Sequence, residues 1–167
     1  MNLRELNTAT TEAARASLRE CCGSAAWVDA MLVRRPFGSE IDLLRAAEEA
    51  WWRLAERDWR EAFASHPQIG VRSHARPKGS SENWSQQEQS GMDGVSASTR
   101  DAMVRGNRSY FKKFGYIYIV CAAGKTCDDM FAILTERLKN DPVAEIRIAA
   151  AEQNKITSLR LKRMLRA

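Results

Sequence analysis

Cysteine is scarce in this chain, and the four cysteines that occur have no regular spacing. Cys21 and Cys22 are adjacent, Cys121 and Cys127 lie far along the chain, and no Cys-x-x-Cys pair is present. A disulfide framework or a structural zinc site would need cysteines at characteristic intervals. We therefore expect free thiols, buried or half-buried, in a reducing compartment.

Long apolar runs are also missing. No window approaches the roughly 20 apolar residues that a membrane-spanning helix needs. The first residues, Met1 to Leu6, lack the apolar centre of a signal peptide. The last three, Leu165-Arg166-Ala167, differ from a peroxisomal Ser-Lys-Leu address. These absences predict a cytoplasmic protein that has no membrane partner.

Histidine occurs only twice, at His66 and His74. The chain has no Gly-x-Gly-x-x-Gly, no P-loop, no His-Glu-x-x-His and no Gly-x-Ser-x-Gly motif. Two histidines without a carboxylate at a matching spacing do not predict a metal site. If the protein is an enzyme, we expect it to work without a cofactor, through positioning, proton transfer and fixed charges.

Acidic residues are fewer than basic ones, and the formal net charge is +5. The excess gathers near the C-terminus, at Lys155, Arg160, Lys162, Arg163 and Arg166. Such a helix is complementary to its own dipole and has a solvated outer face. No nucleic-acid-binding motif accompanies it. We predict no nucleic-acid partner, and a basic helical module that binds nucleic acid or protein without catalysis stays the alternative function.

Helical periodicity runs through nearly the whole chain. A length of 167 residues, with 44% hydrophobic and 28% charged residues, is typical of one globular domain. Apolar side chains recur at intervals close to 3.6 residues, and no internal repeat is present. The sequence therefore predicts a single all-α domain over residues 1–167. It should contain about eight helices and a long active-site loop from His66 to Trp84.

Capping residues and prolines mark where these helices begin. Asn7 or Thr8 is predicted to cap the first helix. Asp141-Pro142 opens the last, with proline at its preferred first position. The other predicted helix starts are Ser24, Ser39, Ser85, Thr126, and Ser98 or a residue near it.

The run from Tyr116 to Ala123 has the composition of a buried strand. No partner strand is evident elsewhere in the sequence, and a lone strand is not stable. We therefore predict a buried extended or helical segment.

The stretch from His66 to Gln89 holds the best candidates for chemistry. Pro67 fixes its own φ and pushes His66 out of helical geometry, and an imidazole titrates near neutrality. Glu88 lies in the first turn of the helix predicted to begin at Ser85. The two form a plausible acid/base pair. The alternative is structural: Ser85-x-x-Glu88 is also a capping box, and His66 then only packs.

Arg160 lies one turn after Ile156 and one turn before Met164, on the apolar stripe of the last helix. An arginine in that place either extends its guanidinium to water or meets an anion. The spacing does not decide between these two positions of the guanidinium.

Together these residues are similar to those of the OHCU decarboxylases (2-oxo-4-hydroxy-4-carboxy-5-ureidoimidazoline decarboxylases), the third enzymes of the route from urate to allantoin. The resemblance covers essentially the whole chain, and the order and spacing of the motifs make it specific. Tyr118 stands where the family often has phenylalanine. The matching motifs are Cys22-Gly23-Ser24 with Trp27, Arg35-Pro36-Phe37, His66-Pro67-x-Ile69-Gly70, Trp84-Ser85-x-x-Glu88-Gln89, Asn107-x-x-Tyr110-x-x-x-Phe114-Gly115-Tyr116, Arg137-Leu138-x-Asn140, Glu145, and Lys155-Ile156-x-x-Leu159-Arg160-Leu161.

The resemblance implies a stand-alone, bacterial-type carboxy-lyase that forms an all-helical homodimer and needs no metal or organic cofactor. Its small-molecule substrate would be OHCU, and its product S-allantoin. A related ureido-imidazoline acid is the other substrate that the resemblance allows. It implies catalytic roles for His66 and Glu88. The positions that it implies for substrate binding are Pro67, Ser85, Gln89, Ile119, Val120, Cys121, Ala122, Ala123 and Arg160. On this hypothesis the backbone amides from Tyr116 to Ala123 would be unpaired donors, which would account for a strand-like run with no partner strand.

Overall fold

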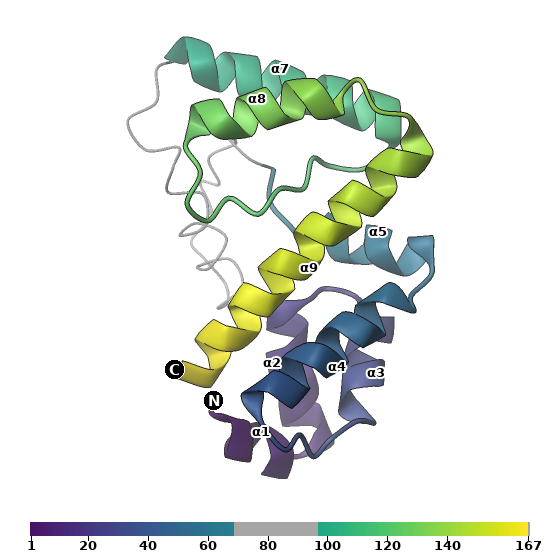
Figure 1. The fold of residues 1–167 in the computed structure, drawn as a ribbon, viewed down its shortest axis with the longest axis vertical. Helices are drawn as coiled ribbons and strands as arrows, with labels where there is room; N and C mark the ends of the chain where they lie inside the picture. Colours follow the sequence, from purple (N-terminus) through teal and green to yellow (C-terminus); the bar gives the residue numbers. More distant parts are fainter. Residues whose placement is uncertain (69–96, 167) are drawn as a thin grey trace. The chain divides into compact units, whose positions relative to one another are not determined.

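The fold is described from a computed structural model of the chain, which places residues 1–68 and 97–166 (Figure 1). Eight helices and no strands occur in these residues, which confirms the predicted all-α class. The helix predicted at Ser85 lies outside the described residues, as does the predicted loop from residue 69 onward. The helices are α1 (Leu3–Thr8), α2 (Thr11–Cys21), α3 (Ala25–Leu32), α4 (Glu40–Trp52), α5 (Glu56–Ala64), α7 (Ala97–Phe114), α8 (Cys127–Arg137) and α9 (Pro142–Arg166).

Most predicted helix starts are confirmed. Ser24, Ser39 and Thr126 are the N-caps of α3, α4 and α8, and each side-chain oxygen accepts a bond from a backbone N–H in the first turn. At the start of α9, Asp141 Oδ1 accepts hydrogen bonds from the backbone N–H groups of Val143 and Ala144, at 3.0 Å each. These helices therefore begin where a polar side chain can accept hydrogen bonds from the free N–H groups of the first turn.

The predicted cap of the first helix was wrong. Thr10 caps α2, and a separate short helix, α1, precedes it with Asn2 as its cap. Asn7 is engaged elsewhere, because its side-chain amide both donates to the carbonyl of Phe37 and accepts from its N–H, at 2.9 Å each. The Thr8 hydroxyl donates to the Arg4 carbonyl within α1. Tertiary pairing of Asn7 thus replaces the local capping that sequence alone suggested.

The described chain divides into two compact units, and α5 and α9 each contribute residues to both. The first unit comprises Met1–Ala62 with Asn154–Ala167, and the second comprises Phe63–Gln153. The prediction of one domain over residues 1–167 stays a prediction.

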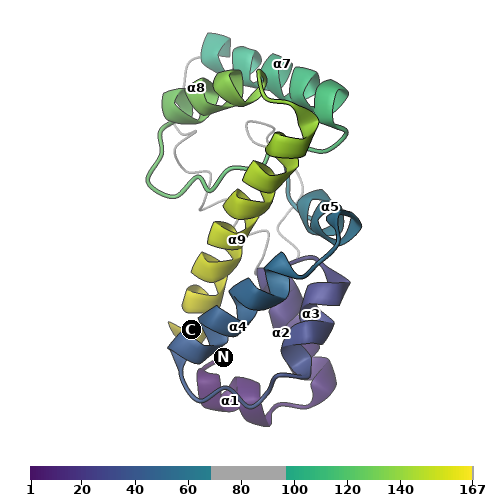
Figure 2. The ribbon, with the colours of Figure 1, turned by 45° about the vertical axis from the view of Figure 1, so that its right-hand side comes forward.

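In the first unit, α2, α3 and α4 pack on one another, as both ribbon views show (Figures 1 and 2). Trp27 and Trp51 are fully buried there. The Trp27 indole N–H donates to the carbonyl of Ala47 at 3.0 Å, which joins α3 to α4. Full burial of such large side chains supplies much of the hydrophobic stabilisation of this unit.

In the second unit, α8 lies along α7 in both views (Figures 1 and 2). A Cβ at Gly106 would stand 2.7 Å from the end of the Leu134 side chain, so a larger residue there would require that leucine to move. The ring of Tyr110, fully buried, packs at a tilt against that of Phe114 and edge-to-face against those of Tyr116 and Tyr118. Among the described helices, none is long and apolar enough to cross a membrane.

Candidate functional site

His66 lies just beyond the end of α5, as its proline neighbour predicts. Its backbone N–H donates to the carbonyl of Phe63 at 3.1 Å, which closes a last turn after the helix. The imidazole is half-buried, with its Nε2 atom out of contact with solvent, whereas Pro67 is exposed. The position is tied to the second unit's core, because the Phe63 ring packs against that of Tyr116 at 5.3 Å between centroids.

Residues 116–123 cross the second unit without helix or strand structure. The stretch from Tyr118 to Ala122 is buried, with each residue 7% exposed or less. This is the predicted buried segment, which is not helical and has no partner strand among the described residues. An extended chain without a ladder needs other partners for its polar backbone groups.

Side chains supply three of those partners. Arg137 donates from Nη1 to the Ile119 carbonyl at 2.6 Å. The Glu152 carboxylate accepts the Cys121 N–H at 2.7 Å, and the Lys125 ammonium donates to the Cys121 carbonyl at 2.7 Å. The expectation of unpaired amides therefore fails at Cys121, because a carboxylate on α9 reaches it.

Four other backbone amides of the segment are unpaired, as expected. Within residues 1–68 and 97–166, the backbone N–H groups of Ile119, Val120, Ala122 and Ala123 make no hydrogen bond. Ile119, Val120 and Ala122 are buried, and an unmade hydrogen bond on a buried amide costs free energy. Such donors are suited to a polar ligand.

A buried ionic network fixes the arginine that holds this segment. Arg137 and Glu145 are 5% and 0% exposed, and Nη2 lies 2.6 Å from Oε1 of the carboxylate. The Tyr110 hydroxyl donates to the same carboxylate, and the Asn140 amide donates to its other oxygen at 2.7 Å. Glu145 is thus fully satisfied, which a buried charge requires.

The two tyrosines beside Arg137 remain protonated phenols. Burial raises the pKa of both Tyr110 and Tyr118 well above the usual value, although the charge of Arg137 opposes this. The guanidinium carbon lies 4.9 Å from the centre of the Tyr118 ring, within range of a cation–π interaction. The Tyr118 hydroxyl, absent from the phenylalanine more usual in the family, donates to the Met130 carbonyl at 3.0 Å.

Arg160 belongs to the first unit and is 3% exposed. Its Nη1 lies 3.5 Å from the carbonyl oxygen of Glu20. The guanidinium does not extend to water, so this alternative from the sequence is excluded. An arginine kept from water is a strong electrostatic element for any anion that reaches it.

All four cysteines are free and buried, as their spacing predicts. Burial raises the pKa of Cys21 to about 12 and that of Cys22 to about 11, although the Arg160 charge lowers both. These thiols are protonated at neutral pH and therefore are poor nucleophiles. They are therefore not candidates for covalent chemistry.

The structure describes only part of the predicted site. His66, Pro67 and residues 119–123 lie in the second unit, and Arg160 lies in the first. Ser85, Glu88 and Gln89 lie outside the described residues. Sequence reasoning did not anticipate Glu152 and Lys125, and gave Arg137 no role. The bonds of Glu152 and Arg137 join residues 31 and 18 positions apart, so no local pattern could have indicated them, whereas Lys125 bonds a residue only four positions before it.

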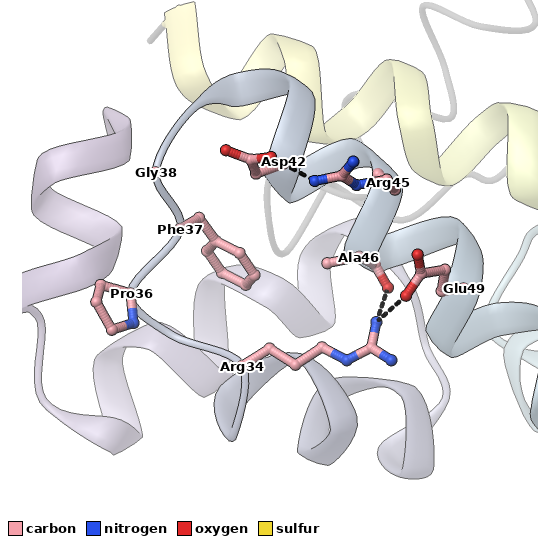
Figure 3. A pocket seen from close by; sticks show the side chains of 8 residues that line it. All are labelled: Arg34, Pro36, Phe37, Gly38, Asp42, Arg45, Ala46 and Glu49. Atoms are coloured by element: carbon pink, nitrogen blue, oxygen red, sulfur yellow. Dashed lines mark hydrogen bonds and ion pairs between the residues drawn. The ribbon is translucent and has the colours of Figure 1, made fainter.

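A hollow of about 510 Å³ lies in the first unit, between α4 and the segment before it (Figure 3). Arg34 reaches the Ala46 carbonyl at 2.6 Å and Glu49 at 3.6 Å. Arg45 pairs with Asp42 at 2.7 Å. The charges in this hollow therefore satisfy one another, and no residue of the predicted site lines it.

Comparisons with known proteins assign this chain to one family. The family model described as OHCU decarboxylase matches residues 7–162. A solved structure described as OHCU decarboxylase in the presence of (S)-allantoin is 35% identical, with a TM-score of 0.78, and the match covers 89% of this chain and 96% of that one. The chain belongs to the OHCU decarboxylase family, which confirms the resemblance set out from the sequence.

Curated relatives agree with this assignment. The uric acid degradation bifunctional protein TTL of Arabidopsis thaliana is 38% identical over 146 residues, which cover 86% of this chain but only 45% of the relative. The 2-oxo-4-hydroxy-4-carboxy-5-ureidoimidazoline decarboxylase of Amia calva is 30% identical over 128 residues, 77% of this chain and 73% of the relative. The chain thus spans less than half of the bifunctional relative.

Proposed function

We propose that this chain catalyses the cofactor-independent decarboxylation of OHCU to S-allantoin in urate degradation. The observation that carries the proposal is the match to the OHCU decarboxylase structure, which is close in sequence and covers nearly all of that chain. The buried extended segment with unbonded amides gives such a reaction a polar surface. The alternative of a basic binding module is weaker, because Arg160 is buried and cannot belong to an exposed basic face.

The reaction accounts for the kinds of residue involved. Loss of CO₂ leaves an electron pair on a ring carbon next to a C=N bond, so that the heterocycle is its own electron sink. The protein has to orient the carboxylate, exclude water and direct a proton to one face of the ring. These tasks require fixed polar groups and an acid/base residue, which matches the candidate site.

The roles proposed for individual residues follow from their chemistry. His66 would hydrogen-bond the substrate hydroxyl or carboxylate and act in proton transfer. Glu88 would set the protonation of that histidine and disfavour the substrate carboxylate in the ground state. Arg160 would bind an oxygen of the ring or ureido group. Pro67, Ser85, Gln89 and the backbone of residues 119–123 would complete the binding of the substrate.

Arg160→Ala should raise KM, with kcat little changed, if the guanidinium binds the ground state and the transition state alike. Arg160→Lys should fall between the alanine variant and the wild type, because an ammonium keeps the charge but lacks the planar fork. Steady-state kinetics on all three proteins measures this. Lys162→Ala, a neighbouring cation on α9, is the control and should leave KM unchanged. Unaltered KM and kcat in Arg160→Ala would remove Arg160 from the binding site.

We further propose that the protein is a homodimer in a reducing compartment such as the cytoplasm. The family resemblance supports the dimer, as do exposed apolar side chains such as Val33 and Ile41. The free thiols support the compartment. Light scattering after gel filtration should give about twice the chain mass of 18.8 kDa. A mass of one chain at micromolar concentration would contradict the dimer.

The proposed function is tested by following OHCU consumption. Urate oxidase and hydroxyisourate hydrolase generate the unstable substrate from urate, and purified protein is added to the mixture. We expect the substrate to disappear faster in proportion to the protein concentration. A folded protein that does not accelerate its decay would mean that the substrate is a related ureido-imidazoline acid or that the catalytic role is absent.

A further inference from the structure

Glu152 occupies a backbone donor of the buried segment. Its Oε2 accepts the N–H of Cys121 at 2.7 Å, across a sequence separation of 31 residues. Glu152 lies on α9 within the second unit and is half-buried. A carboxylate–amide bond of this length is charge-assisted and among the stronger hydrogen bonds in proteins.

A second side chain binds the backbone two residues before Cys121. Arg137 holds the carbonyl of Ile119 at 2.6 Å, and the guanidinium is itself fixed by Glu145. Arg137 therefore binds the carbonyl of the residue before Val120, and Glu152 binds the amide of the residue after it. Because an extended segment has no ladder of its own, these side chains set the orientation of its peptide planes.

The amides left without a bond alternate with the anchored groups. Within the described residues, the N–H groups of Val120 and Ala122, on either side of the Cys121 amide, make no hydrogen bond. Rotation of the Cys121 peptide plane would change the direction of its neighbours. The Glu152 contact thus fixes the peptide group that lies between the Val120 and Ala122 amides.

We propose that Glu152 is a positioning residue for substrate binding: by holding the Cys121 amide, it aims the unbonded amides of Val120, Ala122 and Ala123 at the substrate and keeps the Cys121 amide from acting as a donor. This rests on the proposed function, because the substrate is the ligand it assigns to those amides. Preorganised donors of this kind bind developing or existing negative charge without reorganisation.

The test compares Glu152→Ala with Glu152→Gln. Alanine removes the acceptor, whereas the glutamine side-chain carbonyl can accept the same N–H bond. We expect Glu152→Ala to raise KM for OHCU about tenfold, with a smaller change in kcat, and Glu152→Gln to restore KM to within about threefold of the wild type. Glu136→Ala, which removes an exposed carboxylate from the same unit, should leave KM unchanged.

A second readout does not depend on the reaction. Amide hydrogen exchange of residues 119–123 in the ligand-free protein should be at least about tenfold faster in Glu152→Ala, and near the wild-type rate in Glu152→Gln. Normal KM in Glu152→Ala would overturn the proposal, even with altered exchange, because the contact would then be structural only. Unaltered exchange in that variant would overturn it also. If the wild type itself fails to convert OHCU, the proposed function fails, and the exchange rates still decide whether Glu152 holds the segment.

Discussion

Replacing His66 with alanine should lower kcat by about 10²-fold or more, the usual contribution of a general acid–base residue. The imidazole lies at the end of a rigid turn, half-buried and next to a proline, so that its removal should leave the helices intact. The loss should therefore appear in the chemical step. Steady-state kinetics of OHCU consumption measures it, with circular dichroism of the protein as a check of folding.

The other histidine provides a matched control for this experiment. His74 has no proposed role, and His74→Ala should retain nearly the wild-type kcat. Glu88→Ala should lower kcat as strongly as His66→Ala if the two residues act as a pair. Near-normal turnover of a folded His66→Ala variant would show that the histidine only packs, as the structural alternative holds.

Replacing Arg137 with methionine should lower the free energy of unfolding by about 3–5 kcal/mol, because it leaves a fully buried carboxylate without its partner. Glu145 has no exposure, and three side chains converge on it. The Ile119 carbonyl would lose its donor in the same variant. Urea denaturation followed by circular dichroism gives the change.

Two further variants make this prediction specific. Lys139→Met breaks an exposed pair with Glu136 only a short distance along the chain and should cost less than about 1 kcal/mol. The double variant Arg137→Met with Glu145→Gln should recover part of the lost stability, since no uncompensated charge then remains. If Arg137→Met were as stable as the wild type, the network would not hold the second unit together.

The helical fold could be predicted because its signals are local. Side chains such as Ser24, Ser39 and Thr126 cap the helices that follow them, and the apolar stripe of α9 is buried where the 3.6-residue period places it. Asn7 failed as a cap because a partner 30 residues away, Phe37, binds its side chain. Local propensity is overridden where a tertiary contact offers the same groups a better bond.

The candidate site was accessible to sequence reasoning only in part. The proline after His66 predicts its position beyond α5, and the missing partner strand predicts unbonded amides near residue 120. The bond from Glu152 to Cys121 has no such signal, because it depends on how α9 packs against an irregular segment. The same holds for Arg137 and the Ile119 carbonyl. Contacts between distant residues decide which amides of the segment are left for a ligand.

The handedness of the product tests the central claim most directly. Urate is converted with urate oxidase and hydroxyisourate hydrolase in the cuvette of a circular dichroism spectrometer, the protein is added, and the allantoin signal is followed. We predict rapid growth of the S-allantoin signal, well ahead of the slow spontaneous decay to racemate. No dichroic signal beyond that of the mixture without the protein would contradict the assignment of this chain as an OHCU decarboxylase.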